Sequence, residues 1–159
     1  MKARLWQTLF LLNILITSEV SFAEDANKDV RDLKEQNIMS VLYQQTAAER
    51  LASSLQTFSS AKRALDKALA DPSWSALPGQ NVKDKKTAII VDIDETVLDN
   101  TAYEARMILD GTKYPEGWVS WGKEEVAKEV PGAKYFLNYA ASKGVTIFYI
   151  TNRVVELKE

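Results

Sequence analysis

The chain has 159 residues and a formal net charge of −2, and it contains no histidine and no cysteine. These two absences exclude a Ser-His-Asp triad, a phosphohistidine or cysteine nucleophile and a His/Cys zinc site, so proton transfer within this sequence must fall to carboxylates, Lys or Tyr. The charge gives no electrostatic footprint for a nucleic-acid polymer, and the length suits one domain.

The N-terminus has the three parts of a secretory signal peptide. Lys2 and Arg4 form a positive segment, residues 9–16 are apolar, and residues 21–23 (Ser-Phe-Ala) match an A-x-A-like cleavage site. Because the apolar stretch is short for a membrane-spanning helix, we expect cleavage after Ala23, at the end of a signal peptide covering residues 1–23. The mature protein is then expected to be secreted or periplasmic, without membrane association, and lipid attachment is excluded because the site lacks a cysteine. The alternative is an uncleaved anchor.

Residues 24–80 are predicted to form a helical region. Residues 46–49 (Thr-Ala-Ala-Glu) match a capping box. One helical face, interpreted as core packing, then carries Leu51, Leu55, Phe58, Leu65 and Leu69. Asp71-Pro72 is expected to end this helix. A preceding helix, or an extension of the same one, is indicated by Ile38, Val41 and Leu42.

Residues 81–159 predict an α/β domain. The apolar runs 88–91 and 145–150 are rich in β-branched residues and are expected to be buried strands. Between them we expect an irregular insertion at about 99–130 and a helix that opens at Pro131-Gly132. Its buried side is predicted to carry Phe136, Leu137, Ala140 and Ala141, and Gly144 is expected to follow its end. Strand, helix and strand together predict a parallel βαβ unit.

Only the first two strands of such a sheet can be identified. Parallel sheets usually have more strands and helices on both faces, so the chain is expected to be the N-terminal part of a larger protein.

Two carboxylates, Asp92 and Asp94, follow the first predicted strand directly. Ligands of open α/β sheets bind at the carboxyl ends of strands. Two like charges so close disfavour each other's ionisation unless a cation offsets them, and oxygen ligands suit Mg²⁺. The second strand ends in Thr151, which the parallel arrangement is expected to place beside Asp92. We therefore predict a metal-assisted carboxylate site, with an ordinary polar turn as the alternative.

Four segments carry a family resemblance: IVDIDETVLDN at 90–100, WVSW at 118–121, VPGA at 130–133 and FYITNR at 148–153. Together they resemble the secreted acid phosphatases of the class B/class C type in the haloacid dehalogenase (HAD) superfamily, and most closely the lipoprotein e(P4)-like 5′-nucleotidase group. The resemblance implies a HAD-like Rossmannoid parallel sheet, of which the first two core strands are present, with an N-terminal helical segment and an insertion between strands.

The resemblance also implies roles for individual residues. Asp92 would be the nucleophile that forms an aspartyl-phosphate, and Asp94 would protonate the leaving group and later activate water. Mg²⁺ would be held by the Asp92 side chain and the Asp94 backbone carbonyl. Thr151 would bind the phosphoryl group, with Asn152 as a second candidate. Trp118 matches the position where the family stacks a substrate's base, and a core position is its alternative. The implied substrate is a small phosphomonoester, with nucleoside 5′-monophosphates as one class.

The family's third and fourth motifs, a lysine and the aspartates that complete the metal site, are absent from this sequence. The chain alone is therefore expected to be inactive, although its family is a family of phosphatases. Two alternatives stay open: a non-catalytic storage or binding relative, and an inactive truncated fragment. Arg153 is interpreted as a helix-start or surface charge, and the oligomeric state is left open.

Overall fold

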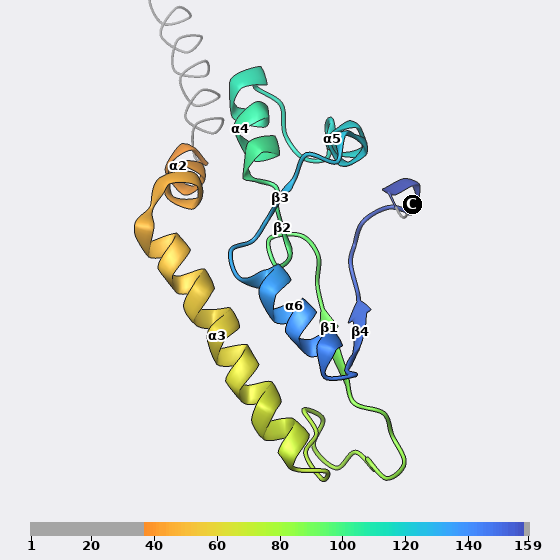
Figure 1. The fold of residues 1–159 in the computed structure, drawn as a ribbon. Coiled ribbons are helices and arrows are strands. Elements are labelled where there is room, and N and C mark those ends of the chain that lie inside the picture. Colours follow the sequence, from red (N-terminus) through yellow and green to blue (C-terminus); the bar gives the residue numbers. More distant parts are fainter. Residues whose placement is uncertain (1–36, 158–159) are drawn as a thin grey trace, which may run out of the picture. The chain divides into compact units, whose positions relative to one another are not determined.

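The structure of the chain is a computed structural model that describes residues 37–157. Nearly all of the described part belongs to one compact unit, residues 39–159. Figure 1 labels the elements, which are α2 (Ile38–Thr46), α3 (Ala48–Ala70), β1 (Ala88–Val91), β2 (Leu98–Asp99), α4 (Thr101–Asp110), α5 (Trp118–Glu124), β3 (Lys128–Glu129), α6 (Ala133–Ser142), β4 (Thr146–Tyr149) and the 3-10 turn η1 (Val155–Leu157).

The predicted signal peptide lies outside the described residues, and the boundary predicted near residue 80 stays a prediction. Within residues 37–157, no helix combines the length and the apolar character needed to cross a bilayer.

A βαβ unit forms the α/β part of the fold. β1 and β4 pair in parallel, with Ala88 opposite Thr146 and Val91 opposite Tyr149. The β-branched and aromatic residues of both strands suit a pleated surface. Along the chain α6 lies between them, and it packs against α3 on one side and β4 on the other (Figure 1). The predicted α/β fold with a parallel sheet is confirmed. The expectation that both strands are buried is wrong, since Ile90 is 71% and Phe148 is 53% exposed.

The core of this unit lies between α3, α6 and the sheet. Leu65 of α3, Ala140 of α6 and Val145 are buried together, and Ile89 and Ile147 pack against them from the strands. Ala140 is 0% exposed, so its small side chain lets the helix lie close to its neighbours.

The buried stripe of α6 agrees with the predicted one at Leu137 and Ala140, and Phe136 is partly buried. Ala133, Leu137 and Ala140 are buried, whereas Ala141 is exposed. Successive helical residues are rotated by about 100°, so Ala141 points away from the stripe that Leu137 and Ala140 share. The prediction for Ala141 is wrong, whereas Gly144 does take the left-handed conformation expected behind the helix, with φ +74°.

The predicted capping box is also wrong. α2 and α3 are separate helices, and the N-cap of α3 is Ala47, which has no capping side chain. Thr46 belongs to α2, where its hydroxyl donates a hydrogen bond to the carbonyl of Leu42 at 2.6 Å. The hydroxyl is thus used within the preceding helix and cannot cap the next one. As predicted, α3 ends before Asp71-Pro72.

The apolar face of α3 is buried only along part of its length. Leu65 is buried, but Leu51 and Leu55 remain about half exposed. The N-terminal half of α3 instead contacts the segment before α6, where the buried Ser54 hydroxyl donates to the carbonyl of Pro131 at 2.7 Å. Gly132 has φ +92°, and a Cβ there would lie 3.2 Å from the Cβ of Phe58, so a side chain would meet both backbone strain and crowding.

A polar contact between α3 and α6 gives the fold a pH-dependent stability. The Tyr139 hydroxyl donates to Asp66, and Lys62 lies 3.3 Å from the same carboxylate. The Tyr139 hydrogen bond, followed by the Lys62 charge, lowers the pKa of Asp66 below its ordinary value. Because the folded pKa is depressed, this contribution is fully present above the unfolded pKa and is lost as the pH falls through the folded pKa.

We therefore expect Asp66→Asn to lower the free energy of unfolding at neutral pH. The deficit should shrink as the pH falls from about 4, the ordinary pKa of the unfolded carboxyl, through the depressed pKa of the folded one. Urea unfolding of both proteins at neutral and acidic pH measures this. Tyr139→Phe is the matched control and should remove most of the same pH dependence. A deficit in Asp66→Asn that stays constant with pH would contradict the assignment.

The insertion is helical rather than irregular, so that prediction is wrong. β2 and β3 pair antiparallel at its base, with Leu98 opposite Glu129, and α4 and α5 lie between them. These helices are held by a buried cluster made of Tyr103, Met107, Trp118 and Trp121. Gly111, with φ +65°, ends α4 in the left-handed conformation that glycine adopts readily.

Candidate active site at the carboxyl end of the parallel strands

The site is built on the loop between β1 and β2. Asp92 follows the last residue of β1 directly. The loop then closes on itself, since the backbone N–H groups of Val97 and Leu98 both donate to the carbonyl of Ile93, at 2.8 and 2.9 Å. Glu95 takes a left-handed conformation, with φ +57°. This turn leaves Asp92 and Asp94 in different surroundings although they are two residues apart.

Asp94 is held by three side chains, Asn100 from the position directly after β2 and Thr151 and Arg153 from the segment after β4. Its carboxylate accepts hydrogen bonds from Asn100 Nδ2 at 2.8 Å, from Arg153 Nη2 at 2.6 Å and Nε at 3.0 Å, and from the Thr151 hydroxyl at 3.5 Å. The Arg153 and Asp94 side chains are only 11% and 22% exposed. A fork of this kind fixes both the position and the orientation of a carboxylate.

The interpretation of Arg153 as a helix-start or surface charge is therefore wrong. Its backbone N–H donates to the Thr151 hydroxyl at 3.1 Å, which turns the chain after β4. The guanidinium then reaches Asp94, and its central carbon lies 5.4 Å from the centre of the Trp118 ring. Thr151, expected beside Asp92, makes its side-chain contact with Asp94 instead.

Asp92 has none of these partners. It is exposed, and it takes part in no ion pair with another described residue. Asn152 is exposed as well. An exposed carboxylate without a counter-charge is open to an incoming substrate or cation, whereas Asp94 is already engaged by the protein.

Two glutamates add to the negative character of the loop. Burial raises the pKa of Glu95, and the charges of Asp94 and Asp99 act in the same direction, against a hydrogen bond from the backbone N–H of Asn100. Burial also raises the pKa of Glu104, and the charge of Glu95 adds to this. Carboxyls crowded in this way are stabilised in their charged form by a nearby cation.

The donors present fit a hard divalent cation. The chain lacks histidine and cysteine, so the side chains here could offer a cation only oxygen ligands, and the exposed Asp92 carboxylate makes no ion pair with another described residue. Among the described residues, no group of three or more Asp or Glu side chains is arranged so that it could hold a metal ion by itself. Mg²⁺ is commonly held by one or two carboxylates with water and substrate phosphates, so the Asp92 carboxylate and the neighbouring Asp94 carbonyl are suitable ligands.

Trp118 is mostly buried. It is 9% exposed and makes an edge-on contact with Tyr103, their ring centres 5.2 Å apart. Its second aromatic neighbour is Tyr114, at 6.0 Å. Trp118 therefore belongs to the cluster that holds the insertion together, with Arg153 over its ring, and a role in stacking a substrate's base stays a prediction.

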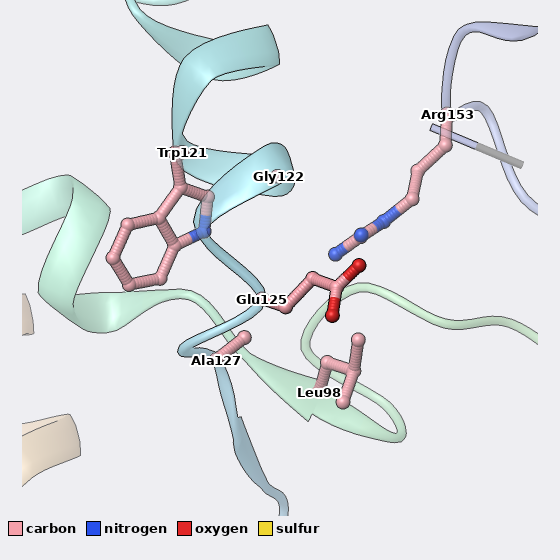
Figure 2. Close-up of a pocket in the computed structure, with 6 residues that line it drawn as sticks. All are labelled: Leu98, Trp121, Gly122, Glu125, Ala127 and Arg153. Atoms are coloured by element: carbon pink, nitrogen blue, oxygen red, sulfur yellow. The ribbon is translucent and has the colours of Figure 1, made fainter. Parts of the chain in front are cut away.

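A cavity of about 170 Å³ adjoins the site (Figure 2). It is lined by Leu98, Trp121, Gly122, Glu125, Ala127 and Arg153. Figure 2 shows the side chains of Arg153 and Glu125 directed toward each other across it. Arg153 thus contacts both this cavity and Asp94. None of the residues assigned a role from the sequence lines the cavity.

Reasoning from the sequence missed Arg153 and Asn100, the two residues that hold Asp94. Asn100 lies at the end of the segment that carries the family resemblance, and Arg153 follows Thr151 by two residues. The signal in the sequence that could have indicated them is their position, because each is a polar residue inside a segment that carries the family resemblance. The pairing of Arg153 with Asp94 depends on tertiary structure, because Arg153 is 59 residues away in sequence.

Comparisons with known proteins identify the family. The family described as HAD superfamily, subfamily IIIB (acid phosphatase) matches residues 12–159. The structure is similar to that of the class C acid phosphatase from Bacillus anthracis, with 39% sequence identity, a TM-score of 0.69 and coverage of 79% of this chain and 49% of that one. A second structure of the Bacillus anthracis enzyme, with tungstate bound, matches with the same identity and TM-score and 48% coverage of that chain.

This chain therefore spans about half the length of the solved acid phosphatase that it matches. The family resemblance and the HAD-like fold predicted from the sequence are both confirmed. The chain belongs to subfamily IIIB of the HAD superfamily, the acid phosphatase subfamily.

Proposed function

We propose that the protein is a Mg²⁺-dependent acid phosphatase that hydrolyses small phosphomonoesters through an aspartyl-phosphate. The observation that carries the proposal is the contrast between its two aspartates. Asp92 is exposed and unpaired among the described residues, as a nucleophile must be, whereas Asp94 is held in one orientation by Asn100 and Arg153. Membership of the acid phosphatase subfamily supports the same chemistry.

In the first step, a carboxylate oxygen of Asp92 attacks phosphorus and the bond from phosphorus to the ester oxygen breaks. Asp94 gives its proton to the departing oxygen, which leaves as an alcohol. In the second step, water attacks phosphorus, Asp94 takes a proton from that water, and the bond to Asp92 breaks to release phosphate. The Thr151 hydroxyl, which contacts Asp94 at 3.5 Å, would donate to a phosphoryl oxygen, with Asn152 as a second candidate.

Mg²⁺ would be held by the Asp92 side chain and the Asp94 backbone carbonyl, and when bound it would offset the negative charge on the phosphoryl oxygens. The tungstate complex of the similar Bacillus anthracis enzyme supports a site for a tetrahedral oxyanion. Export through the predicted signal peptide belongs to the same proposal and rests on residues 1–23.

Nucleoside 5′-monophosphates are the finer part of the proposal. Selective binding of these nucleotides would depend on Trp118, since stacking of a base on an aromatic ring contributes about 1–3 kcal/mol to binding. Because Trp118 is mostly buried beneath Arg153, a base would have to approach the uncovered part of the ring.

Within a chain of the full length of the solved relative, of which this chain spans 49%, these residues are expected to support hydrolysis of p-nitrophenyl phosphate in the presence of Mg²⁺, whereas the 159 residues alone are expected to be inactive. Chelation with EDTA should remove the activity and added Mg²⁺ should restore it, because the Asp92 and Asp94 oxygens hold the metal only weakly without a substrate phosphate. Release of p-nitrophenolate measures the rate. Phosphate or tungstate binding without hydrolysis would replace the proposal with a non-catalytic binding relative. Absence of both binding and hydrolysis in the 159 residues alone would indicate a fragment without function of its own.

A further inference from the structure

Asn100 is the most deeply buried polar side chain in the described part of the chain. It is 2% exposed and lies between the loop that carries the aspartates and α5. Its side chain makes two hydrogen bonds: Nδ2 donates to Asp94 Oδ1 at 2.8 Å, and Oδ1 accepts from Trp121 Nε1 at 3.0 Å. Nothing in the mechanism above requires a buried amide at this place.

The Trp121 contact decides which way the amide points. An indole N–H is a donor only, so the Asn100 atom that faces it must be the oxygen. The amide nitrogen then faces Asp94, whose carboxylate is an acceptor when ionised. If the amide were turned round, two donors would meet at Trp121 and two acceptors at Asp94. A buried polar group without a partner costs about 1–3 kcal/mol, so the observed orientation is strongly favoured.

The two oxygens of Asp94 are consequently not equivalent. Oδ1 receives Asn100 Nδ2, Arg153 Nη2 at 2.6 Å and Arg153 Nε at 3.0 Å. Oδ2 receives only the longer contacts, from Arg153 Nε at 3.2 Å and from the Thr151 hydroxyl at 3.5 Å. Three close donors leave Oδ1 no room for a proton, whereas Oδ2 keeps an open position next to the predicted phosphate-binding hydroxyl.

We propose that Asn100, oriented by Trp121, is a positioning residue that anchors Oδ1 of Asp94 and so presents Oδ2 to the oxygen of the leaving group. This inference rests on the proposed function, because it concerns the residue that transfers the proton. Asn100 itself does not touch the substrate and acts through Asp94.

The test is the dependence of Asn100→Asp on the leaving group. Aspartate keeps the shape and an acceptor for Trp121 but loses the donor to Asp94. An alkyl phosphate needs a proton on its leaving oxygen, whereas p-nitrophenolate leaves without one. General acid catalysis contributes about 10²–10⁴-fold. We therefore expect kcat/KM to fall roughly 10²-fold for the alkyl phosphate and by no more than about tenfold for p-nitrophenyl phosphate.

Asn138→Asp is the matched control, because it adds the same charge at an exposed position of α6. It should leave both substrates unaffected. Equal losses on the two substrates in Asn100→Asp would indicate a purely structural residue and overturn the proposal. Trp121→Phe keeps an aromatic ring at this place but lacks the indole donor. If Asn100→Asp does not fold, Trp121→Phe should show the same difference between the two substrates, with a smaller magnitude.

A second readout does not need turnover. In the ¹⁵N-labelled chain, the Asn100 side-chain amide protons are expected to exchange slowly with water, and to exchange faster in Trp121→Phe. Unchanged exchange would show that Trp121 does not orient the amide, and would overturn the inference. If the wild-type protein hydrolyses neither substrate, the proposed function fails, and the exchange measurement still decides whether Asn100 is held as described.

Discussion

Replacing Asp92 with asparagine is expected to abolish phosphatase activity. The amide keeps the shape of the side chain but offers no negatively charged oxygen to attack phosphorus, so the aspartyl-phosphate cannot form. Loss of a nucleophile in a unit of cooperating residues lowers kcat by a factor on the order of 10⁴ or more. Acid quenching after mixing with radiolabelled substrate should trap phosphorylated protein in the wild type and none in the variant.

The same substitution should leave stability nearly unchanged. Asp92 is exposed and has no ion pair with another described residue, and surface substitutions of this kind usually change the free energy of unfolding by less than about 0.5 kcal/mol. Asp110→Asn, at the exposed end of α4, is the matched control and should retain full activity. Turnover by Asp92→Asn within tenfold of the wild type would rule out Asp92 as the nucleophile.

The parts of the fold that the sequence predicted correctly are those with a strong local signal. β1 and β4 are short β-branched runs, and Gly144 stands where a left-handed residue ends α6. Both features depend on the backbone preferences of a few neighbouring residues, and here those local preferences agree with the global fold.

The insertion carried no comparable signal. Tyr103 and Met107 lie four residues apart on one face of α4, but they form a core with Trp118 and Trp121 only when α4 and α5 meet. The capping box failed for a related reason: the Thr46 hydroxyl had two possible partners, and the carbonyl of Leu42 took it.

In the candidate site, too, the residues with a local sequence pattern were predicted and those that depend on tertiary structure were not. Asp92 and Asp94 were found because a carboxylate pair directly after a strand is a local pattern with a chemical meaning. The residues that distinguish the two aspartates were not found, because Asn100 and Arg153 reach Asp94 only through the loop closure and the return of the chain after β4. The sequence therefore indicated the chemistry of the site, and tertiary structure assigns one aspartate to anchoring contacts and leaves the other free.

Replacing Arg153 with alanine is expected to have the second large effect. Arg153 forms a fork with Asp94, and removing it leaves a mostly buried carboxylate with only Asn100 and a long contact to Thr151. The loss in the free energy of unfolding should lie between the ~1 kcal/mol of an exposed pair and the ~3–5 kcal/mol of a fully buried one. Activity should fall too, because Asp94 loses part of its orientation.

The chain contains a matched control for this prediction. Arg106 forms a similar fork with Glu124, at 2.6 and 2.7 Å, and its guanidinium lies 4.8 Å from the centre of the Trp121 ring. Each arginine thus pairs with one carboxylate and lies over one tryptophan ring. The Arg106 and Glu124 side chains, however, are 48% and 40% exposed. Burial is the main difference, since water solvates the Glu124 carboxylate when its partner is removed.

Chemical denaturation of Arg153→Ala and Arg106→Ala compares the two sites directly, and Arg153→Lys separates charge from geometry. We expect Arg153→Ala to be much less stable than Arg106→Ala, and Arg153→Lys to recover only part of the difference, because an ammonium cannot reproduce the fork. If Arg153→Ala and Arg106→Ala lose the same free energy of unfolding, water solvates Asp94 when Arg153 is removed. The Asp94 carboxylate would then not be anchored by this contact, and its distinction from Asp92 would have to come from Asn100 alone.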